Sequence, residues 1–171
     1  PFEPVIGTLV RPDAEDALGD EAHRRGLPTL KIWSRGRADL ASARWLADQA
    51  RREGISLLHA HDYKSLTLGA LVMGRTQLPL VATFHGDTAA SLPLRAYEAW
   101  ARLLGNLAHA VAAVSAPLTR RLRRWILTAP VHHVPNGIRV SNPCSADERA
   151  RARRELGIPA DRQVVSVVGR L

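Results

Sequence analysis

Two short, mostly apolar runs of this chain each end on side chains that can take up or release protons. Residues 56–58 lead into His59-Ala60-His61-Asp62, and residues 80–84 lead into His85-Gly86. Histidine changes its charge near neutral pH and serves in proton transfer, hydrogen bonding and metal binding. If the two runs are neighbouring parallel strands, their tips meet at the edge where open α/β sheets bind ligands. We therefore expect one cleft, lined by His61, Asp62, His85 and Gly86.

The strand tips leave several kinds of site open. We interpret His59 and His61 as lying on opposite faces of their strand, which makes His61, at the tip, the better site candidate. A metal centre at His61, Asp62 and His85 is an alternative, but no regular ligand spacing supports it and we predict none. The chain also lacks a G-x-S-x-G elbow, a P-loop and a strand-linked G-x-G-x-x-G. Their absence from the sequence argues against serine hydrolases, P-loop enzymes and ordinary dinucleotide binding.

Alternating strand and helix patterns must position these residues. Strand patterns fall at residues 5–10, 29–33, 56–61, 79–84, 110–114 and 131–134, and helical spacing at 13–25, 38–53, 65–74, 93–107 and 117–127. This alternation is typical of parallel βαβ units. We predict an α/β domain with a doubly wound, Rossmann-like parallel sheet.

The character of the chain changes at Arg139. A polar stretch is followed by a charged helical pattern at 146–156 and an apolar run at 163–168. We interpret residues 1–139 as one domain that is incomplete at its start. Residues 140–171 are then a linker and the first strand of a second, truncated domain. Both ends of the chain look cut, so we expect a longer polypeptide.

Composition indicates a globular protein. Of the 171 residues, 46% are hydrophobic and 23% are charged, as in soluble domains. The single cysteine, Cys144, excludes an internal disulfide framework and makes the cytoplasm the default compartment. No apolar run approaches the ~18 residues that a membrane-spanning helix needs.

The charge is strongly basic and unevenly spread. The formal net charge is +8, and no Asp or Glu occurs from Ala99 to Ala146. Such a field attracts phosphate groups, anionic lipid or nucleic acid. The helix predicted at 117–127 carries four arginines largely opposite its apolar face: Arg120, Arg121, Arg123 and Arg124. This face is either an ordinary solvated surface or a patch for the inner face of an anionic membrane.

Two further motifs follow strand patterns. Ser115 comes directly after the run at 110–114 and either caps the following helix or binds a ligand, with capping favoured. Asn136-Gly137 follows Pro135 and predicts a tight turn, because both residues tolerate positive φ.

Together, five short motifs carry a family resemblance. They occur in this order: His59-Ala60-His61-Asp62, Thr83-Phe84-His85-Gly86, Ala113-Val114-Ser115, Val134-Pro135-Asn136-Gly137-Ile138 and Val167-Val168-Gly169-Arg170-Leu171. From Val5 onward, the chain resembles the N-terminal half of a GT-B-fold retaining glycosyltransferase of family four, the "group 1" enzymes, without the first strand of that fold.

The resemblance implies two Rossmann-like domains that face a cleft, with the acceptor held mainly by the first and a nucleotide sugar by the second. His85 matches the family's active-site histidine, and Arg170 the arginine that helps to neutralise the donor diphosphate. His61, Asp62, Gly86 and Ser115 would border the acceptor. Asn136 and Gly137 match the turn at the hinge between the domains.

The chain departs from the family pattern in three ways. Arg139 stands where the family usually has Asp after Asn-Gly-Ile. The family's first strand should precede Val5, so we expect a gap between the strand at Val5 and the one at Leu58. The glutamate pair of the second domain should lie beyond Leu171, and we expect the fragment alone to be inactive.

The leading hypothesis is sugar transfer from a nucleoside-diphosphate sugar with retention of anomeric configuration, in cell-envelope polysaccharide or glycolipid synthesis. The acceptor would be a sugar, a lipid-linked or a small molecule, and no cofactor, metal or nucleic acid would take part. The alternatives are an epimerase of nucleotide sugars with the same fold, and a non-catalytic basic module that binds anionic membrane or nucleic acid.

Overall fold

A computed structural model describes residues 2–36, 39–86, 92–137 and 143–165. The chain divides into two compact units, Pro1–Asn136 and Gly137–Leu171. The boundary lies close to the one inferred from the sequence, and the assignment of the second unit to a donor-binding domain stays a prediction.

Strands and helices alternate through the first unit, as predicted. The elements are β1 (Ile6–Val10), α1 (Ala17–Arg24), β2 (Thr29–Trp33), α2 (Leu40–Arg52), β3 (Leu58–Ala60), α3 (Tyr63–Thr76), β4 (Leu80–Phe84), α4 (Leu92–Gly105), β5 (Ala110–Ala113), α5 (Ala116–Leu122) and β6 (Val131–His133). Every described strand pair is parallel. The unit therefore has the predicted α/β, Rossmann-like arrangement. The second unit contributes α6 (Ala146–Glu155).

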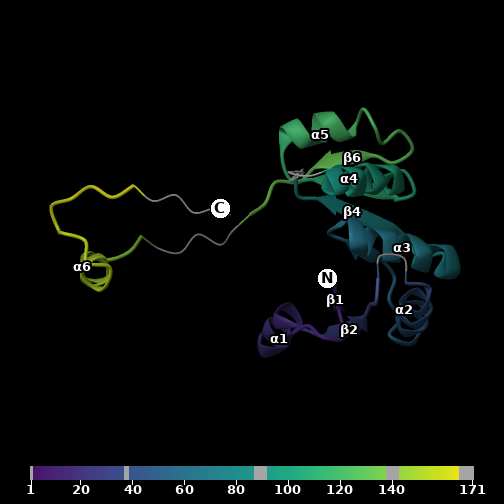
Figure 1. Ribbon diagram of the computed structural model, residues 1–171, viewed down its shortest axis with the longest axis horizontal. Helices are drawn as coiled ribbons and strands as arrows, with labels where there is room; N and C mark the ends of the chain where they lie inside the picture. The colour runs from purple at the N-terminus through teal and green to yellow at the C-terminus, as the bar shows by residue number, and fades with distance from the viewer. Residues whose placement is uncertain (1, 37–38, 87–91, 138–142, 166–171) are drawn as a thin grey trace. The chain divides into compact units, whose positions relative to one another are not determined.

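The strands form two sheets. One pairs β1 with β2, and the other has the order β3-β4-β5-β6. In Figure 1 the strands follow one another across the unit, from β2 and β1 at the bottom to β6 at the top. Among the described residues no ladder joins β1 to β3. The gap expected between the strands at Val5 and Leu58 is therefore present.

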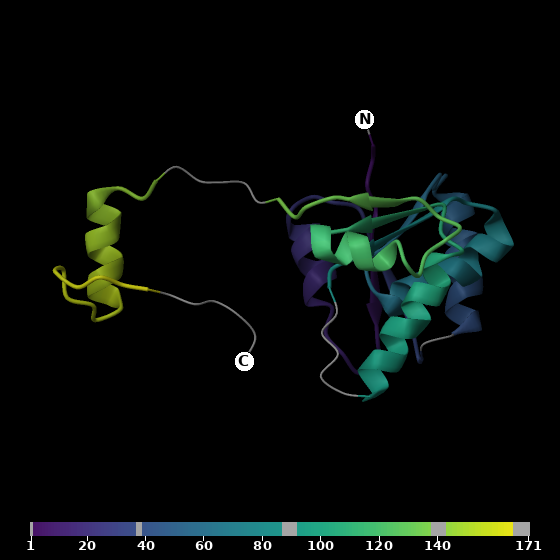
Figure 2. The ribbon, with the colours of Figure 1, turned by 90° about the horizontal axis from the view of Figure 1, so that it is seen from above.

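Helices hold the two sheets together where backbone hydrogen bonds do not. Ile32 of β2 shares a buried cluster with Ala43 of α2 and Val72 of α3, and partly buried Leu9 and Leu58 pack against it. A second cluster around Leu80, Val111 and Leu122 fills the four-stranded half, and Leu58 packs against that one too. Burying each Val, Leu or Ile side chain of these clusters stabilises the fold by roughly 1.5–3 kcal/mol. Figure 2 shows the purple α1 and the blue α2 on opposite sides of the unit, as a doubly wound fold requires.

Polar side chains fix where the helices begin. Asp39, Asp62 and Ser115 occupy the N-cap positions of α2, α3 and α5, and each accepts hydrogen bonds from backbone N–H groups of the first turn. An N-cap of this kind satisfies amides that have no partner inside the helix. Because α3 and α5 begin just after β3 and β5, the caps also fix the geometry of the strand tips.

Two predicted helices are shorter than expected. The pattern at 117–127 forms α5 only as far as Leu122, because Asn106 bonds the chain just beyond it: its amide donates to the Trp125 carbonyl and its oxygen accepts from Leu127 N–H. The pattern at 13–25 becomes helical only from Ala17, because the buried Asp16 carboxylate caps the helix there.

The strand predicted at 163–168 is not seen in the part of the chain that the structure describes. Residues 163–165 belong to no strand, and the remainder of that prediction lies outside the described residues.

Candidate functional site

The tips of β3 and β4 bring three histidines into one row. The β3–β4 register sets His59 opposite Val81 and Ala60 opposite Ala82. His59 Nε2 lies 2.7 Å from Thr83 Oγ1, and His61 Nδ1 lies 3.1 Å from His85 Nε2. The two strand tips that the sequence suggested as partners therefore touch through His61 and His85.

One interpretation of this row was wrong. His59 and His61 do not point to opposite faces: their ring centroids are 4.3 Å apart, at an interplanar angle of 35°. Side chains alternate along a strand, so residues two apart share a face. His59 is accordingly an exposed member of the row and no core histidine. The row continues with His85, whose ring centroid is 5.4 Å from that of His61.

The surroundings of His59 and His61 favour the neutral form of each imidazole. Burial lowers the pKa of His59, and the nearby His61 and His85 lower it further. Burial also lowers the pKa of His61, assisted by His85 and opposed by Asp62. Near neutral pH, His61 is therefore mostly uncharged. In the contact between His61 Nδ1 and His85 Nε2, one ring nitrogen donates the hydrogen and the other accepts it.

Asp62 has a structural function beside this row. Its Oδ1 accepts from Ser65 N–H at 2.7 Å, and the Ser65 hydroxyl oxygen accepts from the backbone N–H groups of His61 and Asp62. These hydrogen bonds fix the backbone of His61 and Asp62 to the first turn of α3. A part for Asp62 in acceptor binding stays a prediction.

Gly86 and Ser115 stand at two further strand ends. Gly86 has a φ of +138°, a conformation that side-chain-bearing residues rarely adopt, and the space beside it is open. Ser115 Oγ accepts from Leu118 N–H at 3.4 Å, so its predicted capping function is confirmed. For both residues, contact with an acceptor stays a prediction.

The expected hinge and donor-phosphate residues lie near or beyond the described boundary. The division between the two units falls between Asn136 and Gly137, while their function as a hinge stays a prediction. Arg139 and Arg170 lie outside the described residues.

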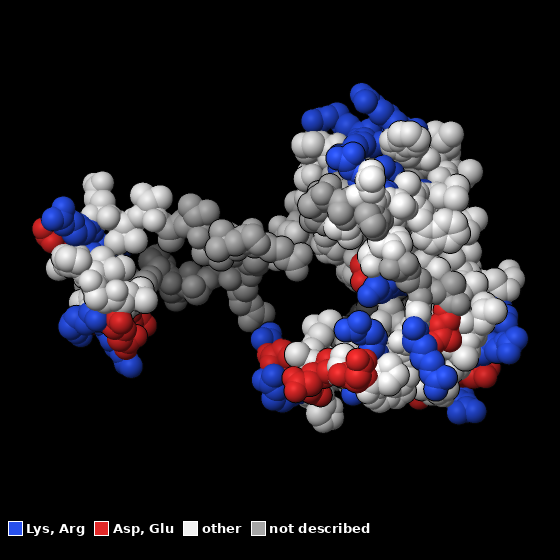
Figure 3. All heavy atoms as spheres, in the orientation of Figure 1, with Lys and Arg blue, Asp and Glu red and all other residues white. Residues whose placement is uncertain are grey.

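The four arginines around α5 are not equivalent. Arg123 donates from Nε and Nη2 to the carbonyl oxygen of Val131, at 3.2 and 2.9 Å. It therefore ties the end of α5 to β6. Arg120, Arg121 and Arg124 are exposed, and Figure 3 shows basic side chains gathered around α5 on the face in view.

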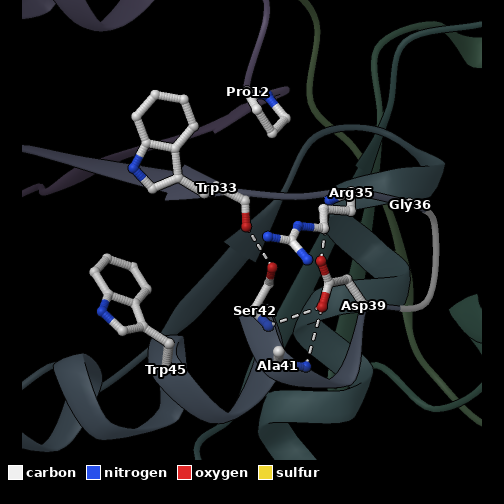
Figure 4. A pocket seen from close by; sticks show the side chains of 8 residues that line it. All are labelled: Pro12, Trp33, Arg35, Gly36, Asp39, Ala41, Ser42 and Trp45. Carbon is white, nitrogen blue, oxygen red and sulfur yellow. Dashed lines mark hydrogen bonds between the residues drawn. The ribbon is translucent and has the colours of Figure 1, made fainter.

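Sequence reasoning missed a hollow at the ends of β1 and β2. It has a volume of about 940 Å³ and is bordered by Trp33, Arg35, Asp39, Ser42 and Trp45 (Figure 4). Asp39 accepts from the backbone N–H groups of Arg35, Ala41 and Ser42. These hydrogen bonds lower the pKa of Asp39 to about 2, and the one from the Arg35 N–H has the largest effect. The signal available in the sequence was an Asp at the start of the helical pattern at 38–53, between Trp33 and Trp45.

Two absences among the described residues bear on other kinds of site. No group of three or more His, Cys, Asp or Glu residues among them has an arrangement that could hold a metal ion. None of the helices in the described ranges combines the length and the apolar character needed to cross a membrane.

Known proteins resemble this chain in sequence. TuaC of Bacillus subtilis, named as a candidate teichuronic acid biosynthesis glycosyltransferase, is 30% identical over 170 residues, covering 95% of this chain and 43% of TuaC. The phosphatidyl-myo-inositol mannosyltransferase of Mycobacterium tuberculosis is 31% identical over 127 residues, covering 74% of this chain and 31% of that protein. The chain therefore spans less than half the length of these curated relatives.

A solved structure shares the fold, and a family model matches most of the sequence. HepE of Anabaena, crystallised with UDP and glucose, superposes with a TM-score of 0.67 at 19% identity, covering 87% of this chain and 42% of HepE. The model described as Glycosyltransferase Family 4 matches residues 6–142. The recognition made from the five ordered motifs is thus confirmed: the chain belongs to Glycosyltransferase Family 4.

Proposed function

We propose that the full-length protein containing this chain transfers a sugar from a nucleoside-diphosphate donor to an acceptor, with retention of anomeric configuration. The observation that carries the proposal is the contact between His61 and His85 at the carboxyl edge of β3 and β4. Two imidazoles in contact can donate and accept hydrogen bonds at sugar hydroxyl groups.

Names of related proteins support the class of substrate. HepE was crystallised with UDP and glucose. TuaC is named for teichuronic acid biosynthesis, and the mycobacterial relative for mannosyl transfer to phosphatidyl-myo-inositol. A nucleotide-sugar donor and a cell-envelope polysaccharide or glycolipid acceptor are therefore the substrates we propose here.

In the proposed reaction, the bond between the anomeric carbon and the diphosphate oxygen breaks while the acceptor oxygen bonds to that carbon from the same face. The acceptor hydroxyl proton passes to the leaving phosphate. His85 would position or polarise the transferred sugar, held in orientation by His61, and Arg170 would pair with the diphosphate. Enzymes often owe most of their rate enhancement to stabilising the charge that develops in the transition state, here on the leaving diphosphate.

Replacing His85 tests this proposal. In the full-length protein, His85→Ala should reduce sugar transfer by about 10²-fold or more, the range for loss of a well-placed proton-handling group. His133→Ala is a matched control, because His133 is an exposed histidine at the end of β6. Unchanged transfer by His85→Ala would remove His85 from the mechanism. An epimerised nucleotide sugar formed without acceptor would point to the epimerase instead.

We also propose that the exposed arginines around α5 attach the protein to an anionic membrane surface. Each basic residue close to such a surface contributes about 1 kcal/mol of attraction. Reversing Arg120, Arg121 and Arg124 to Glu should abolish sedimentation with phosphatidylglycerol vesicles at low salt. Arg123 is left intact because its guanidinium holds β6. Equal sedimentation of the variant and the parent would contradict the attachment.

A further inference from the structure

The hollow at the ends of β1 and β2 presents two indole rings. Trp33 ends β2 and is 52% exposed, and Trp45 lies on α2 and is 40% exposed. Figure 4 shows the two rings one above the other on the same side of the hollow, with Asp39 and Arg35 on the opposite side. Large aromatic rings that face an open hollow together are typical of binding sites rather than of a folded core.

Hydrogen bonds hold this hollow in shape. The Ser42 hydroxyl donates to the Trp33 carbonyl, which ties the end of β2 to the first turn of α2. Asp39 caps the same turn through Ala41 and Ser42 N–H and also accepts from Arg35 N–H. The Lys31 ammonium lies 4.5 Å from the centroid of the Trp33 ring and helps to hold the indole in place. A preformed site of this kind costs little conformational entropy when it binds.

The side chains specify the chemistry of an occupant. The face of an indole ring is apolar and carries partial negative charge, which complements the C–H face of a sugar ring. Arg35 is exposed and turns its guanidinium toward the hollow in Figure 4, where it can form paired hydrogen bonds with a carboxylate or phosphate. Stacking and charge together favour a sugar that carries an anionic group over a bare anion.

A second hollow lies beside this site and extends to the first residues of α3. It has a volume of about 420 Å³ and shares Arg35, Gly36 and Asp39 with the first. Tyr63 and Lys64 also border it, and they directly follow the His61-Asp62 tip of β3. The two hollows therefore adjoin at Arg35, Gly36 and Asp39, and together they are called the trough.

We propose that Trp33, Trp45 and Arg35 form a subsite for a sugar unit that carries a carboxylate or phosphate group. The sugar subsite itself is inferred only from the residues that line the trough. Its assignment to the acceptor rests on the proposed function.

Calorimetric titration of the full-length protein tests the subsite with four probes: tetragalacturonate for the carboxylate source, mannose 6-phosphate for the phosphate source, cellotetraose as a neutral sugar, and UDP. We expect saturable binding of at least one anionic sugar. Trp33→Ala and Trp45→Ala should each weaken it about tenfold, which corresponds to about 1.4 kcal/mol. Arg35→Gln should weaken the anionic sugar more than cellotetraose. Trp100→Phe is the matched control, because Trp100 is 46% exposed but does not border the trough.

Three results would overturn the subsite: no saturable binding of either anionic sugar, wild-type affinity in both tryptophan variants, or an equal loss in Trp100→Phe. Loss of UDP binding alone in the tryptophan variants would also overturn it, because the indoles would then stack on a nucleobase. Trp33→Phe and Trp45→Phe, with melting curves, separate lost binding from misfolding. Sugar-transfer assays on the same preparations distinguish the two proposals. If the wild-type protein binds the anionic sugar but transfers none, only the proposed function is removed. If the wild-type protein transfers sugar and the tryptophan variants bind the anionic sugar as well as it does, only the subsite is removed.

Discussion

At the scale of single residues, the row of three histidines places His59 and His61 where a positive charge is disfavoured. His59, His61 and His85 lie in sequence, with neighbouring ring centroids 4.3 and 5.4 Å apart. Burial first, and then the charge of neighbouring rings, raises the free energy of protonating His59 and His61.

The row should make the fold sensitive to mild acid. Burial first, and then neighbouring histidines, place the pKa values of His59 and His61 below their usual 6.5. Between the folded and the unfolded pKa the unfolded chain binds more protons. The contribution to stability is therefore complete above about pH 6.5 and is lost as pH falls through the folded values. We expect the melting temperature to fall between pH 7 and pH 5, and to fall less in His61→Asn. Parallel curves for the two proteins would contradict this account.

Some of these residues could be found from sequence and others could not. Abrupt apolar-to-histidine transitions placed His61 and His85 at neighbouring strand tips, and the structure brings their rings together. Trp33 and Trp45 escaped notice because a tryptophan in a strand or helix gives the same apolar signal whether it is buried or exposed. The exposure of both rings depends on how α2 packs against β2, which the sequence pattern does not give.

At the scale of elements, short polar side chains determine where the helices of the carboxyl edge begin. Asp39 shows this most clearly, because three backbone N–H groups converge on its carboxylate. The same residue borders both hollows. A cap at this point therefore serves the stability of α2 and the shape of the trough together.

Removing the Asp39 cap should cost measurable stability. We expect Asp39→Ala to lower the free energy of unfolding by about 1 kcal/mol, and Asp39→Asn by less, because asparagine is also a good N-cap. Because the pKa of Asp39 is about 2 in the folded protein, the contribution of its ionised carboxylate to stability is complete above about pH 3.9 and is lost as pH falls through 2. Urea denaturation at pH 7 measures the difference. Asp13→Ala, at an exposed position in the same unit, is the control and should change little.

Some boundaries of helices and strands can be predicted from sequence patterns, and others cannot. The strand pattern at 29–33 coincides with β2, whereas the helical pattern at 117–127 overruns α5. The pattern matches both ends of β2, whereas the strand patterns at 56–61 and 131–134 extend beyond β3 and β6. The end of α5 depends on Asn106, a residue of the preceding helix–strand connection, which no local pattern reveals.

At the scale of the whole chain, the first unit has unequal halves. The β3–β6 sheet carries the larger core cluster, while β1 and β2 are attached through side-chain packing on α2 and α3. Family membership and the parallel fold could be predicted from the order of the motifs. The extent of the packing between the two sheets could not, because it depends on contacts between residues far apart in sequence.

These halves should open separately. Amide hydrogens of β1 and β2 should exchange faster than those of β4 and β5, because their half contains fewer buried apolar contacts and no ladder to β3 among the described residues. Hydrogen-exchange mass spectrometry of the chain near pH 7 resolves the two regions. Equal protection of β1 and β4 would show that the unit opens cooperatively.

The interrupted sheet has a consequence for handling the protein. Within the described ranges β1 pairs only with β2, and β3 pairs only with β4, so each presents backbone N–H and C=O groups along one side. Such an edge is a template for any extended peptide of suitable alternation, including another copy of the same chain. If residues 1–171 are prepared alone, these edges favour self-association as the protein concentration rises, and a separate apolar peptide supplied in trans could complement the fold.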